Sequence, residues 1–116
     1  GLSFKSNTDD VRESSSVEMI KKIRDEGGKI NAFDPVAGDS MKKLFPDICY
    51  KSSWEEACSD ADGAVIMTEW NEFRGISLSK LKSIMKTPIL LDTRNIIPIE
   101  KLKENGFHFD NVGHIF

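Results

Sequence analysis

The chain has 116 residues, of which 39% are hydrophobic and 30% are charged, and its net charge is -3. This length fits one domain that buries roughly two-thirds of its unfolded surface, so we predict a single domain over residues 1–116. The net charge excludes a general attraction to nucleic acid or to an anionic membrane. The absence of an 18-residue apolar run and of a signal peptide indicates a cytoplasmic protein. Cys49 and Cys58 have neither metal-binding nor CxxC spacing, so we expect free thiols and no metal site.

The first loop of the chain is dense in charge. It follows residues 2–4, which we expect to be the carboxyl end of a strand, and residues 3–13 hold two cations and three carboxylates. The start at Gly1, directly before the end of a strand, suggests that the chain was cut from a longer protein or has lost a tag. Three serines then offer caps for a helix, and Ser15 with Glu18 has the spacing of a capping box.

Beyond this loop, apolar periodicity and turn residues predict alternating helices and strands. In chain order we expect a helix ending at Gly27, a strand over 29–34, a short helix or turn over 36–45, a weak strand over 48–51, a short helix ending near Asp60, a strand over 63–68, a helix capped by Ser77, a strand over 88–91, a helix from Pro98 to Asn105 and an edge strand over 107–112.

The same patterns predict which side chains are buried. Met41, Leu44 and Phe45 should face inward, and both cysteines should lie in the core. The unbroken small apolar run over 63–68 is typical of a strand covered by helices on both faces, so we expect it to be the central strand.

Alternating strands and helices predict an α/β fold, a three-layer, Rossmann-like open parallel sheet with helices on both faces. The loops after its strands should open on one carboxyl edge, where ligands bind in such sheets. The charged residues in the three loops expected there include Lys5, Arg12, Glu69, Arg74, Asp92 and Arg94.

Cations gathered at one edge would bind phosphate or pyrophosphate, arginine through paired donors and lysine as a point charge. In the alternative, each arginine only pairs with a neighbouring carboxylate, for example Arg94 with Asp92. No G-x-G-x-x-G follows a strand, so we expect Asp34 to close a turn before Pro35 rather than to bind a ribose. No arrangement of a nucleophile and a base is evident, so no catalytic residue is predicted.

Four motifs resemble those of a known family. They are the run GLSFKSNTDDVRES over residues 1–14, Phe33-Asp34-Pro35, Thr68-Glu69-Trp70 with Phe73, and Asp92-Thr93-Arg94-Asn95. In this order they resemble the C-terminal UDP-binding domain of the UDP-glucose 6-dehydrogenases, within the UDP-glucose/GDP-mannose dehydrogenase family. The Thr-Glu-Trp motif favours the UDP-glucose branch. Thr93 departs from the family's Asp-Gly-Arg, which weakens the assignment of the sugar.

The resemblance implies that a parent enzyme oxidises UDP-glucose to UDP-glucuronate in two hydride transfers to NAD. By motif position, Phe4, Lys5 and Arg94 would contact the UDP-sugar, and Arg12 would reach an NAD bound mainly by an absent N-terminal domain. The catalytic cysteine would lie in that domain too, so we predict that this chain alone is inactive. The resemblance also implies a homo-oligomeric parent.

Two alternatives stay open. The parent could be a UDP-N-acetylhexosamine dehydrogenase or another nucleotide-sugar dehydrogenase. The chain could also be a free-standing nucleotide-binding or regulatory module of the same fold that acts through a protein partner.

Overall fold

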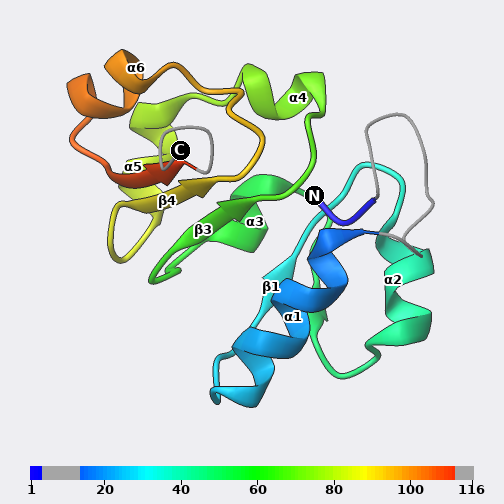
Figure 1. Cartoon of the computed structure of the whole chain (residues 1–116). Coiled ribbons are helices and arrows are strands. Elements are labelled where there is room, and N and C mark those ends of the chain that lie inside the picture. The colour runs from blue at the N-terminus through cyan, green and yellow to red at the C-terminus, as the bar shows by residue number, and fades with distance from the viewer. Residues whose placement is uncertain (4–13, 112–116) are drawn as a thin grey trace. The chain divides into compact units, whose positions relative to one another are not determined.

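The structure of the chain, a computed structural model, describes residues 1–3 and 14–111. Helices and strands alternate along it, and every strand pair is parallel, so the predicted α/β class is confirmed. The chain divides into two compact units, Gly1–Ala57 and Cys58–Phe116. Hydrogen bonds between described strands form one two-stranded sheet in the first unit and one three-stranded sheet in the second (Figure 1).

The first unit is built from two helices and two short strands, with a third helix at its end. These elements are α1 (Ser15–Asp25), β1 (Asn31–Ala32), α2 (Gly38–Leu44), β2 (Cys49–Tyr50) and α3 (Trp54–Cys58). The strand end predicted over residues 2–4 is not observed in the described residues 1–3. The backbone N–H groups of Leu2 and Ser3 bind the side chain of Asp34 instead of a neighbouring strand, which is the physical reason.

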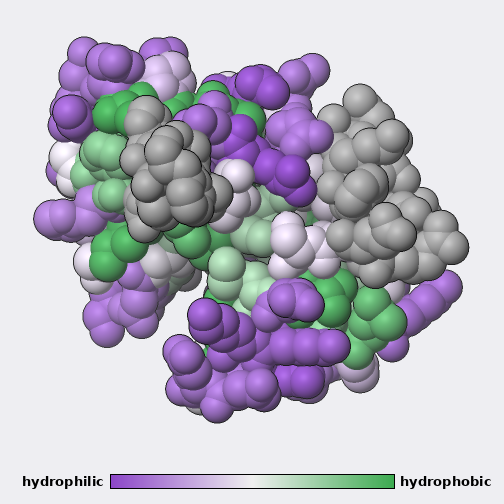
Figure 2. Space-filling model, in the orientation of Figure 1, coloured by the Kyte–Doolittle hydropathy of each residue, from purple (hydrophilic) through white to green (hydrophobic). Residues whose placement is uncertain are grey.

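Helix α1 begins after Ser14, one residue earlier than the predicted capping box. The Ser14 hydroxyl oxygen accepts a hydrogen bond from the Ser16 N–H at 3.1 Å. It also donates to the carbonyl of Ser3 at 3.3 Å, so a tertiary contact selects the cap among three adjacent serines. Ile20 is buried and residues 21 and 22 are exposed. Figure 2 shows a mostly hydrophilic surface over α1.

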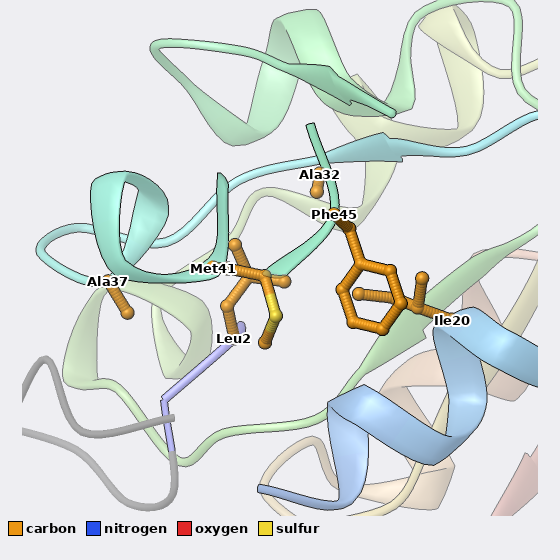
Figure 3. Close-up of a cluster of buried hydrophobic side chains, with 6 residues drawn as sticks. All are labelled: Leu2, Ile20, Ala32, Ala37, Met41 and Phe45. Atoms are coloured by element: carbon orange, nitrogen blue, oxygen red, sulfur yellow. The ribbon is translucent and has the colours of Figure 1, made fainter. Parts of the chain in front are cut away.

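Apolar side chains from α1, β1 and α2 form the core of the first unit (Figure 3). Its members are Leu2, Ile20, Ala32, Ala37, Met41 and Phe45. The predicted burial of Met41 and Phe45 is confirmed, but that of Leu44 is wrong, because its side chain is 52% exposed. Helix α2 ends at Leu44, and Phe45 beyond it has a non-helical backbone (φ -131°, ψ 78°), so helical spacing does not relate the direction of the Phe45 side chain to that of Leu44.

The second unit holds a three-stranded parallel sheet in the order β3-β4-β5. Its elements are β3 (Ala64–Ile66), α4 (Asn71–Arg74), α5 (Leu78–Ile84), β4 (Ile89–Asp92), α6 (Ile99–Glu104) and β5 (His108–Asn111). Within this sheet β4 is the middle strand and β3 lies at an edge, so the prediction of a central 63–68 strand is not met there. An apolar run indicates that the faces of a strand are buried, as at Ile66. It does not indicate whether the strand pairs with one neighbouring strand or with two.

The predicted serine cap of α5 and the predicted edge strand are confirmed, but the predicted burial of the two cysteines in the core is wrong. The Ser77 hydroxyl oxygen accepts the Lys80 N–H at 3.3 Å and caps α5, and β5 is an edge strand of its sheet. Both cysteines are free thiols, but Cys49 is exposed and Cys58 is half-buried. Strand β2 has only two residues, and alternation along a strand places Cys49 on the side opposite to Tyr50, which packs against the core.

Candidate functional site

Strand β4 ends at Asp92, and the turn after it carries Arg94. Asp92 is fully buried, and its carboxylate accepts the backbone N–H of Arg94 at 3.1 Å. The same carboxylate accepts the N–H groups of Ile96 and Ile97, each at 2.9 Å. Three backbone N–H groups of one turn thus bind a single side chain, so Asp92 fixes the backbone of this turn.

The side chain of Arg94 is held at its Nε atom. Nε donates to the carbonyl of Met67 at 2.9 Å and lies 3.6 Å from Oε2 of Glu69. The alternative pairing with Asp92 is therefore wrong, because the Asp92 carboxylate accepts backbone N–H groups and Glu69 is the acid beside Nε. A guanidinium is planar, so a contact at Nε orients the whole group. With 33% of the side chain exposed, this cation is accessible to a dissolved anion.

Thr93 joins the same turn to the end of β3. Its N–H donates to the carbonyl of Ile66 at 3.1 Å, and its hydroxyl donates to the same oxygen. Because β3 and β4 are parallel neighbours, the loops after them open at one edge, as predicted for these two loops. Among the described non-glycine residues only Asp60 and Asn95 have a positive φ, so position 93 does not require glycine.

A second buried carboxylate, Asp34, organises the start of the first unit. Its Oδ2 accepts the N–H groups of Leu2 at 2.8 Å and Ser3 at 3.1 Å, and its Oδ1 accepts those of Val36 and Ala37 at 2.9 and 2.8 Å. Burial alone would raise the pKa of Asp34, but these four backbone hydrogen bonds outweigh it and hold the pKa below its ordinary value.

The predicted turn at Asp34 is thus confirmed, and the carboxylate has a second role that the sequence did not indicate. It binds the residues that precede position 4, while Ser14 binds the carbonyl of Ser3 and Ser16 donates to the carbonyl of Gly1 at 3.1 Å. The residues on either side of segment 4–13 are therefore tied to one another. Phe4, Lys5 and Arg12 lie in that segment, outside the described residues, so their contacts stay predictions.

The described residues do not form a site for a dinucleotide or a metal ion. No G-x-G-x-x-G follows β1, β3 or β4, and both oxygens of Asp34 accept backbone N–H groups rather than facing a ribose site. In residues 1–3 and 14–111, no three His, Cys, Asp or Glu side chains are grouped to hold a metal ion. No helix in these ranges is long and apolar enough to cross a membrane.

Sequence reasoning found Arg94 and missed the groups that hold it. The Met67 carbonyl belongs to the backbone, which no side-chain motif reveals. Position 93 could be noticed in the sequence, because a threonine stands there where the family motif has glycine. Beside the turn, residues 95–100 line a pocket of about 320 Å³.

Residues 1–99 match the family model described as the UDP-glucose/GDP-mannose dehydrogenase family, UDP binding domain. The chain belongs to this family. It is 39% identical to the UDP-glucose 6-dehydrogenase of Rhizobium meliloti and 38% identical to that of Rickettsia bellii, each over 97% of the chain. It spans about a quarter of the length of these relatives, 26% in both cases.

Solved structures of the family have the same fold. The UDP-D-ManNAc dehydrogenase of Pyrococcus horikoshii is 28% identical with a TM-score of 0.75, over 97% of this chain and 24% of that one. A UDP-glucose dehydrogenase from Pyrobaculum islandicum is 25% identical with a TM-score of 0.75, over 95% of this chain and 23% of that one. An NDP-N-acetyl-D-galactosaminuronic acid dehydrogenase from Methanosarcina mazei, at 21% identity and a TM-score of 0.85 over 97% of this chain and 23% of that one, shows the fold alone.

Proposed function

We propose that residues 1–116 are the UDP-sugar-binding domain of an NAD-dependent dehydrogenase that oxidises UDP-glucose to UDP-glucuronate in two hydride transfers. The structural observation that carries the proposal is the oriented cation at the end of β4, where Arg94 donates to the Met67 carbonyl. The family match and the identity of 36–39% to curated UDP-glucose 6-dehydrogenases of Rhizobium and Rickettsia support the reaction and the sugar.

Each proposed site residue has a role set by its chemistry. Arg94 donates paired hydrogen bonds to an oxygen-rich part of the UDP-sugar, and Lys5 adds a positive charge to the same ligand. Phe4 contributes an apolar contact to it, and Arg12 reaches toward NAD. No residue of this chain is assigned to catalysis.

The rest of the parent enzyme would supply what this chain lacks. Since the described residues do not fit a dinucleotide, NAD would be bound mainly by another part of the parent. The homo-oligomeric state of the parent and its cytoplasmic location belong to the same proposal.

A UDP-N-acetylhexosamine dehydrogenase is the second candidate. Its support is the likeness to the Pyrococcus horikoshii UDP-D-ManNAc dehydrogenase at 28% identity. Parallel titrations of UDP-glucose and UDP-N-acetylmannosamine distinguish the two, because the true substrate should bind more tightly.

The test of UDP binding is calorimetric titration of UDP into the 116-residue chain. We expect the wild-type chain to bind and Arg94→Ala to weaken the affinity by about 10- to 100-fold, the loss for hydrogen bonds from a charged group. Lys5→Ala should also weaken binding.

Lys103→Ala is the matched control, since it removes an exposed cation from α6. It should leave the affinity unchanged. Absence of binding by the wild-type chain, or wild-type affinity in Arg94→Ala, would refute the proposed function.

A further inference from the structure

We propose that Thr93 is a positioning residue for UDP-sugar binding, because its hydroxyl locks the turn that carries Arg94 onto the end of β3. This inference rests on the proposed function of Arg94 and adds a residue to which no binding role had been assigned.

The ladder between β3 and β4 ends at the turn that carries Arg94. Its last residue pair is Ile66 with Asp92, so Thr93 is the first residue beyond the paired strand. A carbonyl oxygen has two lone pairs, and the Ile66 oxygen accepts both the N–H and the hydroxyl of Thr93. The hydroxyl thus adds a second attachment where regular pairing stops.

The next residue along each segment makes the next contact. Arg94 follows Thr93, Met67 follows Ile66, and Nε of Arg94 donates to the Met67 carbonyl. Two consecutive residues of the turn therefore bind two consecutive carbonyls at the end of β3. A shift of the turn along β3 would break both contacts, so the first contact sets the geometry of the second.

Asp92 does not duplicate this function. Its carboxylate accepts backbone N–H groups of the turn itself, at Arg94, Ile96 and Ile97. Those bonds shape the turn, whereas the Thr93 hydroxyl fixes the position of the turn on β3. Without the hydroxyl, binding would have to order the arginine at the cost of conformational entropy, and the affinity for an anion would fall.

The test compares Thr93→Val, which keeps the branched shape without the hydroxyl, with Thr93→Ser, which keeps the hydroxyl. Each is combined with wild-type Arg94 and with Arg94→Ala, and UDP affinity is measured by calorimetry. We expect Thr93→Val to weaken binding by about fivefold, the coupling typical of residues in one hydrogen-bonded network. Thr93→Ser should restore the affinity, and Thr93→Val should have no further effect in the Arg94→Ala background.

Equal affinities of Thr93→Val and the wild type would overturn the inference. An equal fold-loss in both backgrounds would also overturn it, because Thr93 would then act independently of Arg94. Failure of the wild type to bind UDP, or a neutral Arg94→Ala, would refute the proposed function instead. Circular dichroism checks that each variant folds, and Thr93→Ala replaces the valine variant in the same cycle if the latter does not.

Discussion

Two buried aspartates, Asp34 and Asp92, each bind the backbone N–H groups of a turn, one in each unit. Each follows or ends a strand and accepts backbone N–H groups of the turn after it, with Asp34 also binding Leu2 and Ser3. Turn N–H groups that are buried without a partner are costly, and an ionised carboxylate satisfies several of them at once. At the residue scale, one aspartate therefore holds the turn after β1 and another holds the turn after β4.

For Asp34 we predict that Asp34→Asn destabilises the chain by about 2 to 4 kcal/mol at neutral pH. In asparagine an NH2 group replaces one of the two accepting oxygens, so its N–H donors would face backbone N–H donors. Urea unfolding followed by circular dichroism measures the difference, and Asp62→Asn, at an exposed position, should be neutral.

The loss of stability in Asp34→Asn should depend on pH, because the pKa of Asp34 is lowered in the folded chain. The pKa of Asp34 is lower in the folded chain, so its stabilisation is fully present above the unfolded-state pKa of about 3.9. It is lost as the pH falls through the lower folded-state pKa. The gap between the wild type and Asp34→Asn should therefore close in acid, and a constant gap would contradict the assignment.

At the scale of elements, the helices α1 and α5 are both capped by serine, in different surroundings. Ser77 is exposed and accepts only the Lys80 N–H among the backbone hydrogen bonds described. Ser14 is buried and bonds to both the Ser16 N–H and the Ser3 carbonyl. The Ser14 cap thus also holds one end of the chain against α1.

Removing these caps should give unequal losses. We expect Ser77→Ala to cost about 1 kcal/mol, the usual value for a cap. Ser14→Ala should cost about 2 kcal/mol, because it also leaves the buried Ser3 carbonyl without that donor. Thermal and urea unfolding of the two variants give the comparison, and equal losses would show that the bond to Ser3 contributes nothing.

At the scale of the whole molecule, the chain is about a quarter of the length of its curated relatives. Its described residues hold an oriented arginine and no dinucleotide or metal site. Under the proposed function, this part binds the UDP-sugar and the chemistry takes place elsewhere in the parent enzyme.

We therefore predict that the purified chain, mixed with UDP-glucose and NAD, produces no NADH above the rate without protein. A purified full-length relative serves as the positive control in the same absorbance assay. NADH formation by the chain alone would contradict both the proposed division of labour and the assignment of no catalytic residue. Absence of both NADH and UDP binding would favour a regulatory module.

Sequence patterns predicted local structure well where the determinants are neighbours along the chain. The Ser77 cap, the burial of Met41 and the edge position of β5 follow from spacing and turn residues. The predictions of local structure were wrong where a residue far away in the sequence determines it. The Ser3 carbonyl selects Ser14 as the cap of α1, and the carboxylate of Asp34 takes the N–H groups that a strand at Leu2 would need.

The candidate site likewise has features that the sequence predicted and features that only the tertiary structure showed. By itself the sequence determined the class of the fold and the family and singled out Arg94 as a candidate site residue, because motifs and apolar periodicity are properties of the chain. Only the tertiary structure decided what holds that arginine: the Met67 carbonyl, the Thr93 hydroxyl on Ile66 and Glu69 in place of Asp92. The reason is physical, since these contacts join two strands some 27 residues apart and use backbone oxygens, which every residue type carries alike.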